Sequence, residues 1–134
     1  MPKLLIFAAC EKVLIDQLNN LSLISVLQEA KVGMPPQGVQ AQLPSGAKLM
    51  APIKWDVLAL WAKTDDKVCE QRVALFDPSG NPTGIDATGE LDFQGKATLR
   101  HMVTVLGLPV YEMGVYLLKL WVREKGQEFG EPIV

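Results

Sequence analysis

The chain has 134 residues, of which 49% are hydrophobic, and its 13 Lys and Arg residues nearly balance 15 Asp and Glu residues. This length predicts one domain over residues 1–134 that can bury a core of its own. The sequence holds no basic cluster interleaved with aromatics, which excludes nucleic acid as the primary partner. No apolar run reaches the length of about 20 residues that a membrane-spanning helix needs.

The first third of the chain contains two predicted strands and a proline-rich loop. Residues Leu4–Ala9 are apolar at every position, which is typical of a strand covered on both faces. Cys10–Asn20 is interpreted as a connection with room for one helical turn. The β-branched content of Leu21–Val32 favours a strand, although a helix fits the same spacing. Prolines predict a loop at Gly33–Gly38, and Val39–Leu43 alternates weakly, as an edge strand does.

The middle of the chain carries the strongest alternation. Ile53–Ala62 places two tryptophans on one parity and predicts a central strand. Val68–Phe76 also alternates between apolar and polar residues and follows after the short turn Thr64–Lys67. We therefore expect these two segments to form a hairpin. Asp77–Gly80 has the Asp-Pro start of a type I turn. Gly84–Phe93 is polar and contains glycines, which predicts a poor strand or a long loop.

The last third of the chain predicts two more strands. Lys96–Leu106 alternates, with His101 on the parity expected to face the core. Gly114–Arg123 is followed by the turn-like Glu124–Gln127 and a short final segment, which predicts a terminal hairpin. The whole pattern predicts an all-β fold: a single antiparallel β-sandwich, immunoglobulin-like or C2-like, with about seven to eight strands.

The beginning of the chain superficially resembles a lipoprotein signal, because small residues precede Cys10. The apolar stretch before this cysteine is too short for a secretory signal, and the acidic Glu11 follows at once. Cys10 and Cys69 lack the C-x-x-C spacing of metal or redox motifs, and two cysteines in a domain of this size suit reduced thiols. We therefore expect a cytoplasmic location.

The sequence predicts no catalytic, cofactor-binding or metal-binding residues. His101 is the only histidine, no G-x-S-x-G elbow is present, and the eleven glycines form no phosphate-binding loop. The loop from Asp77 to Asp86 offers oxygens for calcium, but its spacing departs from that of an EF-hand. Asp65 and Asp66 have the character of solvated turn formers.

The strand Gly114–Arg123 suggests a candidate interface. If Tyr116, Leu118, Leu120 and Val122 face the core, the opposite face carries Leu117, Lys119, Trp121 and Arg123. A tryptophan between cations can be a binding hot spot, but the side chains of Lys119 and Arg123 can also shield it. The candidate interface residues are therefore Leu117, Lys119, Trp121 and Arg123.

Three functions remain open at this stage. The favoured hypothesis is a non-enzymatic protein-interaction or structural module that self-associates or joins a larger assembly through strand edges or the Trp121 face. The second is a ligand- or carbohydrate-binding module that requires Trp55 or Trp61 to be exposed. The third is an enzyme that uses Cys10, Glu11 or His101, and it requires these residues to converge in one cleft.

Several short motifs resemble those of a family of small uncharacterised bacterial β-sandwich proteins, a domain of unknown function. The distinctive one is the F-A-x-C-E-x-V opening over residues 7–13, supported by Ser22–Ile24, Ala59–Trp61, Asp77–Gly80, Gly114–Tyr116 and Pro132–Val134. The resemblance spans most of the chain. It implies a bacterial, compact, β-rich protein, and it transfers no site residues.

Overall fold

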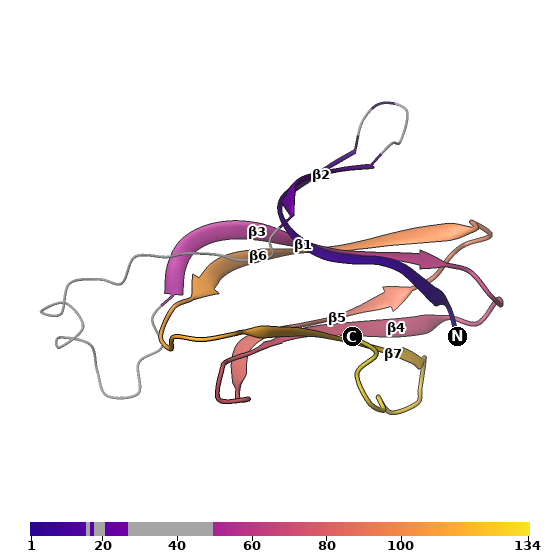
Figure 1. Cartoon of the computed structure of the whole chain (residues 1–134). Helices are drawn as coiled ribbons and strands as arrows, with labels where there is room; N and C mark the ends of the chain where they lie inside the picture. The colour runs from indigo at the N-terminus through magenta and orange to yellow at the C-terminus, as the bar shows by residue number, and fades with distance from the viewer. Residues whose placement is uncertain (16, 18–20, 27–49) are drawn as a thin grey trace, which may run out of the picture.

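The structure is a computed structural model that describes residues 1–15, 17, 21–26 and 50–134. Within these residues the fold is all-β, without a helix (Figure 1). The strands are β1 (Lys3–Ile15), β2 (Leu21–Val26), β3 (Met50–Ala62), β4 (Cys69–Phe76), β5 (Pro82–Leu91), β6 (Thr98–Pro109) and β7 (Leu117–Glu124). The described residues thus include no helix that is long and apolar enough to cross a membrane. The all-β prediction is confirmed.

The strands form two antiparallel sheets that lie face to face in Figure 1. One sheet has the order β2-β1-β3-β6, and the other has the order β5-β4-β7. Every described strand pair is antiparallel. This arrangement agrees with the predicted sandwich.

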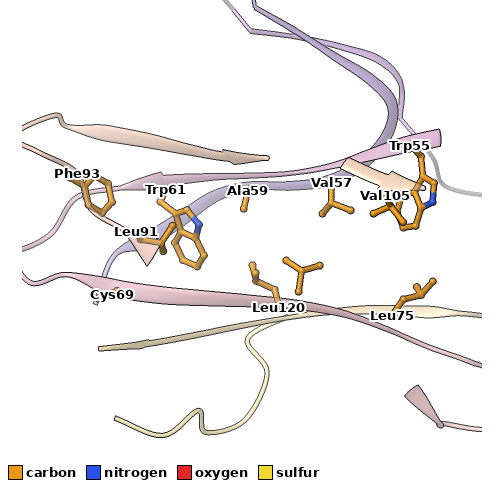
Figure 2. Packing of buried hydrophobic residues seen from close by; sticks show 11 residues of the cluster. Trp55, Val57, Ala59, Trp61, Cys69, Leu75, Leu91, Phe93, Val105 and Leu120 are labelled. Atoms are coloured by element: carbon orange, nitrogen blue, oxygen red, sulfur yellow. The ribbon is translucent and has the colours of Figure 1, made fainter. Parts of the chain in front are cut away.

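The core lies between the sheets and follows the parity that the sequence predicts. In the β3–β6 ladder, Trp55 lies opposite Val105 and Ala59 opposite His101, so one face of both strands turns inward. Figure 2 shows Trp55, Ala59 and Val105 on the side of this sheet that faces Leu75 and Leu120 of the other sheet. Burial of such large apolar side chains stabilises the fold by about 1.5–3 kcal/mol each.

Two predicted elements differ from the structure, and a third is decided between its two alternatives. Cys10–Ile15 continues β1 and is no separate connection, because it pairs with β2 after β1 leaves β3. The predicted hairpin of β3 and β4 is wrong. Both edges of β3 are taken by β1 and β6, so β4 lies in the opposite sheet. Of the two alternatives predicted for Gly84–Phe93, a poor strand or a long loop, the strand is correct for residues 84–91, which belong to β5 and pair along β4.

Of the other predicted elements, some are confirmed and some lie outside the described residues. The turn at Asp77–Gly80 is confirmed: the Gly80 amide donates to the Asp77 carbonyl at 2.9 Å. The final segment returns to β7 as predicted, because the Leu120 amide donates to Val134 and the Ile133 amide donates to Leu120. The predicted loop Gly33–Gly38 and edge strand Val39–Leu43 lie outside the described residues.

Candidate interaction surface

The outer face of the β5-β4-β7 sheet carries Trp121. Trp121 pairs with Arg72 of β4, which in turn pairs with Thr88 of β5. The preceding residue of β7, Leu120, belongs to the core. Trp121 therefore points away from the core, as the sequence predicts. Its exposed fraction is nevertheless 8%.

Trp121 is part of a stack in which cationic side chains alternate with aromatic rings. The Arg72 guanidinium lies 4.7 Å from the Trp121 ring centre, and the Phe76 ring packs on Trp121 with centroids 6.1 Å apart. Asp86 holds Arg72 in place through hydrogen bonds from both Nε and Nη2, the latter at 2.6 Å. Lys119 lies at the other end of the stack, with its Nζ 4.7 Å from the centre of the Phe76 ring. Such contacts between a cation and an aromatic ring are worth about 0.5–1 kcal/mol each at exposed sites.

The segment leading into β7 exposes three apolar side chains within five residues. Met113 is 84% exposed, Val115 is 72% exposed, and Leu117, the first residue of β7, is 52% exposed. Single exposed apolar residues are ordinary on protein surfaces, whereas apolar residues in succession indicate a contact site. We define the β7 surface as Met113, Val115, Leu117, Lys119, Trp121 and Arg123.

Aromatic side chains hold this segment against the β4–β5 turn. The Tyr111 hydroxyl donates to the Asp77 carboxylate at 3.0 Å. Burial, together with this hydrogen bond, raises the pKa of Tyr111 to about 12. The Tyr116 hydroxyl donates to the carbonyl of Glu112 at 2.8 Å and accepts from its amide. The exposed apolar residues therefore lie on an anchored segment.

Gly114 contributes to the same anchoring. Its φ is +136°, a region that favours glycine, and a Cβ added there would lie 2.9 Å from Cβ of Pro78. Close contact with Pro78 thus places Met113 and Val115 beside the β4–β5 turn.

The four candidate interface residues predicted from the sequence all lie on the β7 surface, but in different environments. Leu117 is exposed, and Lys119 and Arg123 are half-buried. The expected shielding of Trp121 by Lys119 and Arg123 differs from the structure, because Lys119 stacks on Phe76 and Arg123 stacks on Phe129 at 4.0 Å. Arg72 from the adjacent strand covers Trp121 instead.

Trp55 and Trp61 are both buried in the core, so neither provides the exposed platform that the ligand-binding hypothesis requires. The Trp55 indole donates to the carbonyl of Gly107 at 2.9 Å. The Trp61 indole donates to Oε1 of Gln71 at 2.7 Å, within the core. These bonds satisfy the two polar indole groups that burial removes from water.

Cys10, Glu11 and His101 do not converge. Cys10 pairs with Asp56 in the sheet and lies outside the core cluster, whereas His101 points inward to Gln71 in the opposite sheet. Burial, and then the charge of Asp56, raises the pKa of the Cys10 thiol. Glu11 is exposed. A thiol with a raised pKa is a poor nucleophile at neutral pH.

Carboxylates in the turns are engaged by the protein itself. Asp77 accepts hydrogen bonds from the amides of Ser79 and Asn81, and Asp65 accepts one from the amide of Lys67. Asp86 binds Arg72, and Asp66 pairs with Lys63. Among the described residues no group of three or more His, Cys, Asp or Glu side chains is arranged to hold a metal ion.

Sequence reasoning missed two features that the structure reveals. Met113 precedes the predicted strand and Val115 lies within it on the parity of Leu117, but neither was a candidate interface residue, and their high exposure assigns them to the β7 surface. The pairing of Gln71 with His101 joins residues that are 30 positions apart. The alternation of β4 places Gln71 on the inward parity between Cys69 and Val73, which is the signal that could have found it.

Comparison of the chain with protein-family models, with curated proteins and with solved structures gives no match.

Proposed function

We propose that this protein is a non-enzymatic interaction module that joins a larger assembly by binding another protein at the β7 surface. The observation that carries the proposal is the run of exposed apolar side chains at Met113, Val115 and Leu117 on an anchored segment. A surface that is already ordered loses little conformational entropy on binding, so more of its contact energy contributes to affinity.

The charges around the β7 surface favour a partner of particular chemistry. Asp86 neutralises Arg72, but Lys119 has no acidic partner among the described residues. A protein that presents an apolar patch beside a carboxylate would match Leu117 and Lys119 together. The proposal also includes the bacterial cytoplasm as location, which the free thiols of Cys10 and Cys69 support.

The first test places a photo-crosslinking amino acid at position 115 and, as a control, at the exposed position 96. We expect a protein that is crosslinked from position 115 and not from position 96. This protein is then purified, and its binding to the wild-type chain is measured by calorimetry.

The decisive measurement compares variants with the purified partner. The double variant Val115→Ser with Leu117→Ser should weaken binding by about tenfold or more, since it removes two exposed apolar contacts. Ile53→Ser removes an exposed apolar residue from β3, outside the β7 surface, and should leave the affinity unchanged. Equal binding by the double variant and the wild type would overturn the proposal, as would identical crosslinked proteins from positions 115 and 96.

A further inference from the structure

Strand β6 forms an edge of the four-stranded sheet. It spans 12 residues, so the edge extends for about 40 Å at a rise of about 3.3 Å per residue. One side of β6 pairs with β3 along nearly its whole length, and the described residues place no strand on the other side. An unpaired edge presents main-chain N–H and C=O groups, and their natural partner is another extended strand.

Within the residues of β6 itself, few of the features that usually prevent strand pairing are present. Arg100 is its only residue with a formal charge at neutral pH, and its one proline, Pro109, is the last residue. The irregularity at Gly107 lies near the same end, which leaves Thr98–Leu106 uninterrupted. Two large side chains of this stretch are exposed, Met102 at 47% and Leu106 at 79%. Natural edges are more often protected by charges, prolines or bulges.

The two edges of the other sheet differ from β6. The C-terminal segment covers part of β7 through the two backbone hydrogen bonds at Leu120. Strand β5 begins with Pro82, contains Gly84 at a φ of +92°, and carries the acidic residues Asp86 and Glu90. If β5 paired with a second β5 about Thr88, Asp86 would meet Glu90 of the second copy, and like charges directly opposite are destabilising. Of these three edges, β6 is the best suited to pair with a copy of itself.

We propose that β6 pairs antiparallel with β6 of a second copy of this chain, so that the two four-stranded sheets join into one continuous sheet across a twofold axis. The distribution of charge along β6 favours a second copy of this chain as the partner strand. In a symmetric antiparallel pair, Arg100 meets its own copy only if the axis passes through Arg100 itself. An axis near Val103 sets Arg100 against Leu106 and Met102 against Thr104, without repulsion between like charges.

The test measures solution mass by light scattering over a range of protein concentrations. The wild type should reach twice the mass of one chain. The variant Met102→Lys with Leu106→Lys should shift the midpoint of dissociation to a concentration about tenfold higher or more, because it places lysines on the paired edge. The matched control, Val115→Lys with Leu117→Lys, carries the same charges on the β7 surface and should dimerise as the wild type does. Circular dichroism and urea unfolding verify that both variants are folded.

A cysteine scan locates the twofold axis, and its result does not depend on whether the lysine variants fold. Single variants Thr98→Cys, Met102→Cys, Leu106→Cys and Val115→Cys are oxidised, and we expect disulfide-linked dimers to form most rapidly at one β6 position and slowly at position 115. A monomer at every concentration would overturn the proposal. A dimer that dissociates only in the β7-surface control would overturn it as well.

Discussion

Gln71 in β4 and His101 in β6 connect the two sheets through a hydrogen bond of 2.8 Å between Nε2 of Gln71 and Nδ1 of His101. The Trp61 indole can only donate, so it binds Oε1 of Gln71 and turns the amide nitrogen towards the histidine. Nδ1 of His101 therefore accepts, and the proton of the neutral ring lies on Nε2. These three side chains form a polar connection between the sheets.

Replacing Gln71 should destabilise the fold strongly. Gln71→Leu has a similar volume but leaves the Trp61 indole and Nδ1 of His101 without their partners. Each unsatisfied buried group costs about 1–3 kcal/mol, so we expect a loss of about 3 kcal/mol in the free energy of unfolding. Urea denaturation measures it, with the exposed Gln127→Leu as the control. Equal stability of the two variants would show that the connection contributes nothing.

Gly89 in β5 makes room for the His101 ring, and Gly89→Ala should be destabilising. A Cβ at this position would overlap Nε2 of His101, whereas Gly130 has open space around it. We expect a loss of about 2 kcal/mol or more for Gly89→Ala and a small effect for Gly130→Ala. The cost of Gly89→Ala should largely disappear in a His101→Ala background. A cost that stays the same in both backgrounds would contradict the steric explanation.

Stability should decrease at mildly acidic pH because of His101. Burial lowers the pKa of His101 below its ordinary value of 6.5 in the folded state. The unfolded chain then takes up the proton at a higher pH than the folded chain does. The stabilisation that comes from keeping His101 neutral is complete above pH 6.5 and is lost as the pH falls from 6.5 to the folded-state pKa. Over this range the free energy of unfolding changes by at most about 1.4 kcal/mol per pH unit.

Two measurements check this pH dependence. NMR titration follows the single imidazole of the chain directly, and urea unfolding gives the free energy at each pH. The variant His101→Asn should lack this part of the pH dependence. A folded-state pKa at or above 6.5 would be inconsistent with the buried acceptor role of Nδ1.

Arg72 should protect Trp121 by covering its ring more than by pairing with Asp86. Arg72→Ala removes this cover, so we expect tryptophan fluorescence to shift to the red and stability to decrease by about 1 kcal/mol. Asp86→Asn breaks a half-exposed ion pair but leaves Arg72 in place, and it should cost at most about 1 kcal/mol without a spectral shift. The same red shift in both variants would indicate that the ion pair, and not the covering side chain, keeps Trp121 buried.

Local patterns in the sequence predict much of the fold. The two-residue period of β3 and β6 assigns Trp55, Ala59 and His101 to the inward face, because successive side chains of a strand point to opposite faces. The same rule places Trp121 outward and Leu120 inward. These predictions are confirmed because each depends only on neighbouring residues.

Local sequence patterns are therefore sufficient to predict the all-β class, the central strand β3 and the inward parity of its side chains. They are not sufficient to place β3 and β4 in different sheets, because a hairpin and a connection between two sheets show the same alternation of apolar and polar residues. The tertiary structure decides this placement, and it also decides that Arg72 covers Trp121 and that Gln71 meets His101. Those contacts join residues distant along the chain, and a local pattern carries no information about which distant side chain comes to lie beside it.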